Sequence, residues 1–211
     1  MKFVVYGTLV VLAVCCVCFS APEPVKVQGP LEWTLDVKLE PLNQILYPED
    51  AAGEQRRFWY TVATVKNATG QDVDFVPRCD LMTDTFQVIP AGKDVSIRVF
   101  EELQDRYELN YPLLEYIELT EKKVLEGRDN AKDIAIIWPD FDARARQVKI
   151  FIGGLSNETV VINHPIAKDA DGSPEKIYLR KTLEVTYEIA GDPAFRSVAK
   201  IIFKGQRWVM R

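Results

Sequence analysis

The chain has 211 residues, of which 47% are hydrophobic, and a formal net charge of −5 at pH 7. A chain of this size buries roughly 70% of its unfolded surface, which is enough for a core that needs no disulfide. The acidic balance disfavours a nucleic-acid-binding protein, because phosphate binding requires clustered positive charge. The nearest basic group, Arg144, Arg146 and Lys149, closely follows Asp140 and Asp142.

The first 20 residues have the pattern of a signal peptide. They contain one charge, Lys2, followed by a mostly apolar run that ends at Phe19. Small residues at the end of such a run favour cleavage after Ser20. Residues 21–30 then form a proline-rich linker, since proline cannot continue a helix. Cleavage would leave 25 basic and 31 acidic residues, a net charge of about −6.

Two alternatives to cleavage stay open. One is a retained N-terminal anchor, although the apolar run is short for a membrane span of about 20 residues. The other is a lipid on Cys15, although Val14 is larger than the residue that usually precedes a lipidated cysteine. Membrane contact is expected only through the leader or such a lipid.

Cleavage would also leave Cys79 as the remaining cysteine. We therefore predict an exported protein of the periplasm, cell envelope or extracellular space whose fold depends on its core.

The N-terminal third of the exported chain reads as strands. Apolar and polar residues alternate over residues 31–40, the period of a half-buried strand, and this alternation places Trp33 in the core. Residues 57–66 are rich in aromatic and β-branched residues and predict a second strand. A turn at residues 67–71 and a short third strand at residues 73–75 follow.

The middle of the chain changes period. We predict strands at residues 85–89 and 94–99 with a turn between them, because apolar residues alternate in both. A spacing of three and four then predicts a short helix over residues 101–108.

Residues 112–126 fit two structures. A second helix could begin after Pro112 and carry a Glu118–Lys122 pair four residues apart. The part near Lys123 fits a strand equally well, so helix and strand both stay open.

Residues 133–159 hold two apolar β-type runs on either side of a charged connection, after a polar turn at residues 127–132. This pattern predicts a central β-hairpin, with residues 139–146 as the loop able to meet a partner. Gly153 and Gly154 end the second run, where positive φ or a close backbone approach is expected.

The C-terminal third continues the strand pattern. A short strand at residues 160–163 precedes a polar loop at residues 164–176. Residues 177–189 show the longest alternation in the chain, and residues 197–204 form a final strand joined to residues 207–211.

These elements predict an all-β fold, an immunoglobulin-like antiparallel β-sandwich with a short helical insertion, and a barrel is the alternative. No repeat and no second composition regime divides the chain. We therefore expect one domain over residues 31–211.

The side chains that could carry chemistry are few. His164 is the single histidine, so Cys/His zinc sites and histidine-based triads lack their parts. Cys79 has no CxxC partner and is expected to be a small buried hydrophobe. Asp169, Asp171 and Glu175 offer oxygen ligands for calcium, against the simpler interpretation of a solvated loop.

Two further groups deserve comparison with carbohydrate chemistry. Asp140 and Asp142 lie two apart, a separation of about 6.5–7 Å on an extended chain, which overlaps that of inverting glycosidases. Acidic loop residues are nevertheless common. Four tryptophans could form a sugar-stacking surface if they were exposed, although core packing is the default. These are Trp33, Trp59, Trp138 and Trp208.

Four segments, IAIIWPDFD, VKIFIGGLSNET, LRKTLEVTYEIAGD and the terminal WVMR, resemble a family of uncharacterised exported bacterial proteins of the planctomycete type. The resemblance covers residues 58–211. It implies an exported bacterial protein and assigns no catalytic residue.

The sequence thus assigns no catalytic, cofactor-binding or metal-binding residue and implies no cofactor. We expect a non-catalytic exported protein that binds or supports an envelope protein or glycan, for instance by adding a strand at an open sheet edge. A carbohydrate-binding module and a hydrolase using Asp140 or Asp142 are the alternatives. The sequence specifies neither the ligand nor the oligomeric state.

Overall fold

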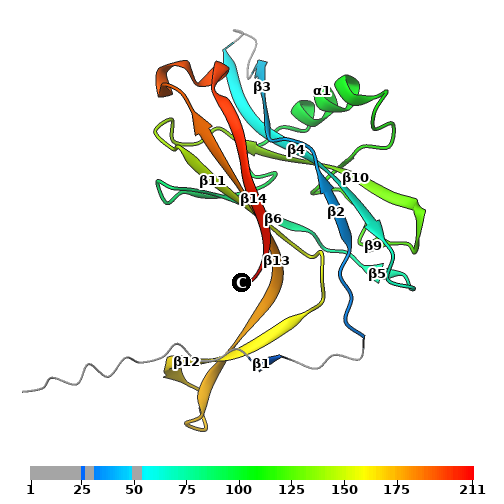
Figure 1. Ribbon diagram of the computed structural model, residues 1–211, viewed down its shortest axis with the longest axis vertical. Coiled ribbons are helices and arrows are strands. Elements are labelled where there is room, and N and C mark those ends of the chain that lie inside the picture. The colour runs from blue at the N-terminus through cyan, green and yellow to red at the C-terminus, as the bar shows by residue number, and fades with distance from the viewer. Residues whose placement is uncertain (1–24, 27–30, 49–53) are drawn as a thin grey trace, which may run out of the picture.

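Figure 1 shows the computed structural model, which describes residues 25–26, 31–48 and 54–211. The predicted signal peptide and most of the predicted linker lie outside the described residues. Among the described residues, no helix is both long and apolar enough to cross a membrane.

The protein is mostly β, with 56% strand and 10% helix, in several antiparallel sheets with a short helix. The first strands are β1 (Val25–Lys26), β2 (Asp36–Leu39), β3 (Asn43–Pro48), β4 (Gln55–Asn67), β5 (Val73–Asp74), β6 (Arg78–Thr83) and β7 (Val88–Pro90). Helix α1 (Ile97–Tyr107) precedes β8 (Glu115–Tyr116), β9 (Lys123–Val124), β10 (Gly127–Pro139) and β11 (Gln147–Gly153). The chain ends with β12 (Thr159–Lys168), β13 (Pro174–Ala190), the 3-10 helix η1 (Pro193–Val198) and β14 (Lys200–Met210).

The larger sheet has the strand order β1-β12-β13-β11-β6-β7, and β14 also pairs with β13. Its inner face is apolar, because Leu81, Ile150 and Val185 lie side by side on neighbouring strands and are each at most 1% exposed. The residues that alternate with these three along their strands face outward. The strand predicted over residues 177–189 is therefore confirmed, and its alternation places one face of β13 in the core from Leu183 to Ile189, whereas Ile177 and Leu179 are half-buried.

The smaller sheet has the order β2-β4-β10-β8, with β3 also on β4, and β5 and β9 form a separate pair. The central strands β4 and β10 are buried along most of their paired length, as expected for strands covered on both faces. Helix α1 packs beside them through the Tyr107 hydroxyl, 3.1 Å from that of Tyr60. Buried residues of both sheets and of α1 form one apolar cluster.

The N-terminal strand predictions are confirmed in their main features. β4 contains the predicted strand at residues 57–66, and Leu35 lies in the core at 1% exposure. Trp33 is partly buried against the core, whereas Leu31 is exposed, so the strand is shorter than its alternation suggested.

The central hairpin predicted over residues 133–159 is wrong. β10 pairs with β4 and β8, whereas β11 pairs with β6 and β13. Residues 140–146 therefore carry the chain from one sheet to the other. Two apolar runs with a short connection look the same in sequence whether they pair with each other or with distant strands. The polar turn predicted at residues 127–132 is also wrong, because β10 begins at Gly127 and has an irregular register up to Lys132.

The strand predicted at residues 94–99 is wrong as well, because α1 begins there. Asp94 has a φ of 58°, and the Ser96 side chain caps the helix by accepting from the Arg98 N–H. The alternating apolar residues belong to a helical stripe. Its buried members are Val99, Phe100 and Leu103.

Residues 112–126 contain two short strands, β8 and β9, so the second helix is wrong and the strand alternative near Lys123 is confirmed. The sequence reading missed β6, a six-residue strand directly after Pro77. The strand orders do not confirm the immunoglobulin-like topology, which stays a prediction.

Gly154 provides a test of how closely the chain before β6 approaches the chain after β11. It has a φ of +86°, and a Cβ atom there would overlap the backbone of Val76. Gly172 has a similar φ of +84° but no neighbour within 4 Å of such an atom.

We expect Gly154→Ala to lower the free energy of unfolding by about 2–4 kcal/mol, since it combines a left-handed backbone with overpacking. Gly172→Ala should cost about 1 kcal/mol, because the backbone term acts there alone. Urea denaturation followed by circular dichroism measures both. Equal losses would contradict the close approach.

Candidate functional site

The two aspartates that suggested a hydrolase have separate structural roles. Trp59 Nε1 donates to Asp140 Oδ1 at 2.7 Å, and Arg57 Nη1 lies 3.2 Å from Asp140 Oδ2. Asp142 accepts hydrogen bonds from the Arg144 side chain and backbone N–H, which lower its pKa to about 2. A general acid must hold a proton near neutral pH, so this geometry disfavours Asp142 in that role.

The 140–146 connection is a packed corner. Arg196, 3% exposed, reaches under it from η1, and its Nη1 donates to the carbonyl oxygens of Ala143 at 2.7 Å and Ala145 at 3.1 Å. The guanidinium carbon also lies 5.2 Å from the Trp59 ring centroid and 4.7 Å from that of Phe141. Burial lowers the pKa of Arg196. This anchoring makes residues 139–146 a poor candidate for the partner-binding loop.

The four tryptophans do not form an exposed row. Trp59 and Trp138 are fully buried, and Trp33 packs partly against the core. Trp208 is 39% exposed, with the Lys181 ammonium 5.3 Å from its ring centroid. Stacking of a sugar chain on several coplanar tryptophans is therefore not supported by these positions.

His164 and the loop that offered oxygen ligands for calcium both make local hydrogen bonds. His164 Nδ1 accepts from the backbone N–H groups of Ile166 at 3.1 Å and Ala167 at 2.8 Å, within β12. Asp171 Oδ1 accepts from the N–H and hydroxyl of Ser173. Over residues 25–26, 31–48 and 54–211, no three histidine, cysteine or acidic side chains gather as a metal site.

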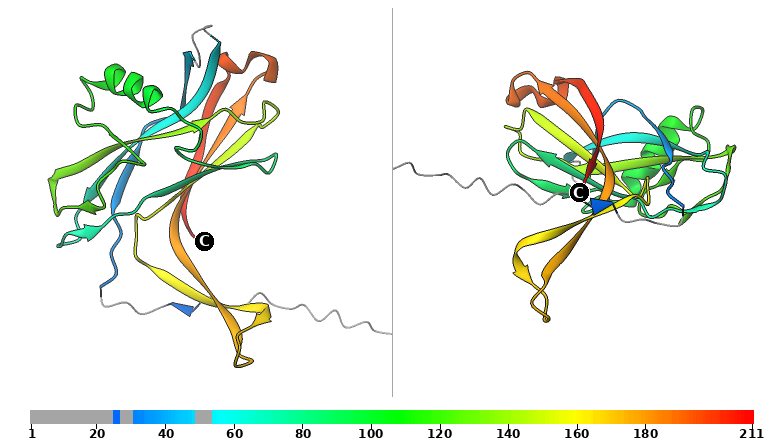
Figure 2. Two further views of the ribbon diagram at one scale, coloured as in Figure 1. Left: turned by 180° about the vertical axis from the view of Figure 1, so that it is seen from behind. Right: turned by 60° about the horizontal axis from the view of Figure 1, so that its bottom comes forward.

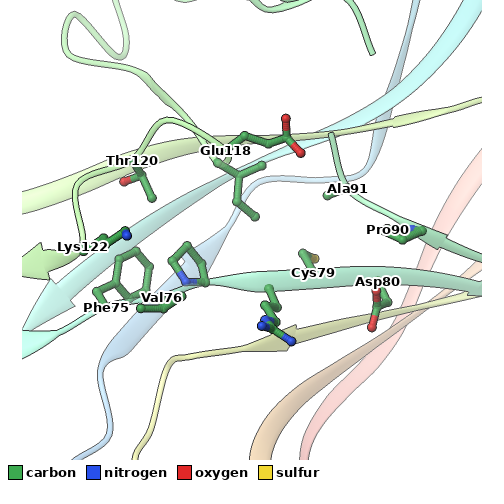
Figure 3. A pocket seen from close by; sticks show the side chains of 12 residues that line it. Phe75, Val76, Cys79, Asp80, Pro90, Ala91, Glu118, Thr120 and Lys122 are labelled. Carbon is green, nitrogen blue, oxygen red and sulfur yellow. The ribbon is translucent and has the colours of Figure 1, made fainter. Parts of the chain in front are cut away.

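A hollow of about 610 Å³ lies between the start of β6 and residues 117–122 (Figure 3). Two backbone hydrogen bonds join the segments that line it, from Phe75 N–H to the Lys122 oxygen at 2.9 Å and from Ala91 N–H to the Cys79 oxygen at 2.8 Å. Charges of both signs line it. They come from Arg78, Asp80, Glu118 and Lys122.

Cys79 also lines this hollow but is a poor nucleophile. It is 5% exposed, and burial, with a smaller effect of the adjacent Asp80, raises the pKa of its thiol well above the usual range. The structure thus confirms the prediction that Cys79 is buried.

A second hollow, of about 540 Å³, adjoins the first and shares Val76, Arg78 and Asp80 with it. It lies on the outer face of the larger sheet. Its lining includes two further arginines, Arg180 and Arg211, together with aromatic and small residues. The latter are Phe151, Gly153, Gly154, Ser156, Tyr178 and Thr182.

One side of this second hollow continues into a projecting arm. β12 and the first half of β13 form a two-stranded ribbon that extends away from the two sheets, with β1 paired to β12 (Figures 1 and 2). β14 pairs with the other side of β13 only as far as Arg180, which exchanges backbone hydrogen bonds with Arg211 at 2.8 and 3.1 Å. Among the described residues, no strand pairs with that side over residues 174–179.

The sequence reading identified neither the arginines nor this edge. The three arginines lie far apart in the chain and only the pairing of β6, β13 and β14 brings them together. The alternation over residues 177–189 carried a partial signal, since it placed Tyr178 and Arg180 on the outer face.

Comparison of the chain with models of known protein families, with curated proteins and with solved structures finds no match. The resemblance to exported bacterial proteins stays a prediction.

The Arg196 anchor gives a testable prediction for the corner between the sheets. Arg196→Ala leaves two carbonyl oxygens without a donor and a cavity beside two aromatic rings, so we expect the free energy of unfolding to fall by about 3 kcal/mol.

Arg144→Ala is the matched control, because Arg144 lies in the same corner but is exposed and paired with Asp142. It should change the free energy by less than about 1 kcal/mol. Urea denaturation of both variants makes the comparison. A similar small loss in both would show that Arg196 does not anchor the corner.

Proposed function

We propose that the protein is a non-catalytic exported binding protein that captures an extended segment of another envelope protein by strand addition. The partner segment pairs with the open side of β13 over residues 174–179. The observation that carries this proposal is that β13 has a strand on one side only along the projecting arm. Export rests on the leader pattern of residues 1–20.

The backbone of β13 offers a defined set of hydrogen-bonding groups to such a partner. Successive residues of a strand direct their N–H and C=O groups to opposite sides. The backbone N–H and C=O of Arg180 point to the β14 side, whereas the backbone N–H of Lys181 donates to the Glu158 oxygen on the β12 side. Tyr178 and Lys176 therefore present their N–H and C=O groups on the open side. A strand in line with β14 would satisfy these groups.

The arm also exposes apolar surface that a partner would cover. Tyr178 is 60% and Ile166 84% exposed. A two-stranded ribbon is marginally stable in water, so an added third or fourth strand would stabilise it. Pro174 at the far end lacks an N–H group, which limits the open stretch to a few residues and favours a short partner segment.

The two other hypotheses have weaker support. A carbohydrate-binding module would need exposed coplanar tryptophans, and two of the four tryptophans are fully buried. A hydrolase would need a proton on one carboxyl, and the pKa of Asp142 is lowered to about 2. We also propose that the fold is an immunoglobulin-like sandwich and that the protein belongs to the exported bacterial family that it resembles.

Photo-crosslinking on the arm tests the proposal. A photo-reactive amino acid at position 176, in the organism that makes the protein, should give a discrete adduct with an envelope protein. Adding Tyr178→Pro should strongly reduce the adduct, because proline removes the N–H group on the open side but spares those that pair with β12.

Tyr178→Phe is the matched control and should leave the adduct unchanged, since it keeps the backbone donor. Thermal unfolding checks that each variant is folded. No adduct, or an adduct that Tyr178→Pro leaves at full intensity, would contradict strand addition.

A further inference from the structure

Three arginines converge on the outer face of the larger sheet, beside the open edge of β13. Arg180 and Arg211 are direct neighbours across the β13–β14 pair, and Arg78 lies opposite Gly153 across the β6–β11 pair. All three line the 540 Å³ hollow. Side chains two residues apart on a strand share a face, so the side chains of Tyr178 and Arg180 lie on the same surface of β13, and both line the hollow.

The hollow is locally positive although the chain is acidic. Among the described residues that line it, Asp80 is the acidic one. Its Oδ2 lies 3.7 Å from Arg211 Nη2, while the Arg211 guanidinium carbon lies 4.2 Å from the Phe151 ring centroid. The exposed side chains of Arg78 and Arg180 form no hydrogen bond or ion pair with any other described residue.

The neighbouring acidic residue on this face is already neutralised. Glu184 accepts from Arg207 Nε at 3.1 Å and lies 3.5 Å from Lys149 Nζ. Burial alone would raise the pKa of Glu184, but the hydrogen bonds and charges of Arg207 and Lys149 together lower it below its usual value. The positive charge of Arg78 and Arg180 is therefore left for a ligand.

We infer that this hollow receives carboxylate side chains of the partner segment, so that the segment is an acidic one; this inference rests on the strand addition proposed above. A strand along the open side of β13 places its outward side chains about 4.5–5.5 Å from those of Lys176 and Tyr178. Successive outward side chains lie about 6.5–7 Å apart, so one can face Lys176 while the next reaches toward Arg180.

The chemistry of the groups favours a carboxylate. Guanidinium groups bind planar carboxylates through two parallel hydrogen bonds, and two such groups here are unpaired. A hollow of 540 Å³ is large enough for one or two side chains. An anionic sugar chain shares the carboxylate, but the adjoining strand edge favours a polypeptide.

Synthetic peptides test the inference with the full chain. An eight-residue peptide that alternates glutamate with valine should bind at least about tenfold more tightly than the same peptide with glutamine for glutamate, measured by fluorescence anisotropy at low salt. Arg78→Gln and Arg180→Gln should each weaken the glutamate peptide by about fivefold to tenfold and leave the glutamine peptide unchanged.

Arg144→Gln is the control for a general loss of positive charge, because Arg144 is exposed but lies in the corner between the sheets, where it pairs with Asp142. It should leave binding unchanged. Equal affinity for the two peptides, with both weakened by Tyr178→Pro, would overturn the acidic specificity while strand addition survives. Absence of binding to the glutamate peptide would overturn the inference as well.

A uronic-acid oligosaccharide provides the last comparison. Binding that Arg180→Gln weakens but Tyr178→Pro leaves unchanged, together with no preference for the glutamate peptide, would assign the hollow to a glycan and overturn the peptide inference. Weak or absent binding of this oligosaccharide, with the peptide preference intact, is the expected result.

Discussion

The long strand β13 sets the arrangement of the larger sheet, because its 17 residues pair with three other strands. Its second half lies between β11 and β14, and alternate side chains such as Val185 enter the core. Its first half has β12 on one side and, beyond Arg180, no strand among the described residues on the other. The same strand therefore fixes the core, projects the arm and leaves a row of backbone donors and acceptors open to a partner.

The two sheets are joined at the corner where the chain leaves β10. A buried guanidinium is costly where its donors are unsatisfied. Nη1 of Arg196 donates to the carbonyl oxygens of Ala143 and Ala145, whereas its Nε and Nη2 have no hydrogen-bond partner among the described residues. Phe141 and Trp59 supply aromatic faces, and Asp140 holds the Trp59 indole N–H. Because Asp140 and residues 140–146 serve this corner, the partner surface is better sought on the arm, at the other end of β13.

Sequence patterns predicted the elements whose burial follows one simple period. The alternation over residues 177–189 is such a case, since one face of β13 enters the core over residues 183–189, whereas residues 57–66 were predicted from their aromatic and β-branched composition and form β4, which is covered on both faces. Six residues of alternation at 94–99 also fit the start of a helical stripe, so the choice between strand and helix depended on packing. Pairing partners are not encoded locally, which is why β10 and β11 were misassigned as a hairpin. For the same reason, the gathering of Arg78, Arg180 and Arg211 could not be predicted.

An acidic chain can still bind an acidic segment, because the carboxylates that repel the segment are distant from it whereas the arginines that attract it are in contact with it. Beyond residue 20 the chain carries 25 basic and 31 acidic residues, and most of these lie well away from the hollow. At physiological ionic strength the Debye length is about 8 Å, so repulsion from distant carboxylates is largely screened. Contacts between guanidinium and carboxylate groups at about 3 Å are screened much less. We therefore expect the unpaired arginines beside β13, rather than the net charge, to decide which segment binds in the proposed interaction.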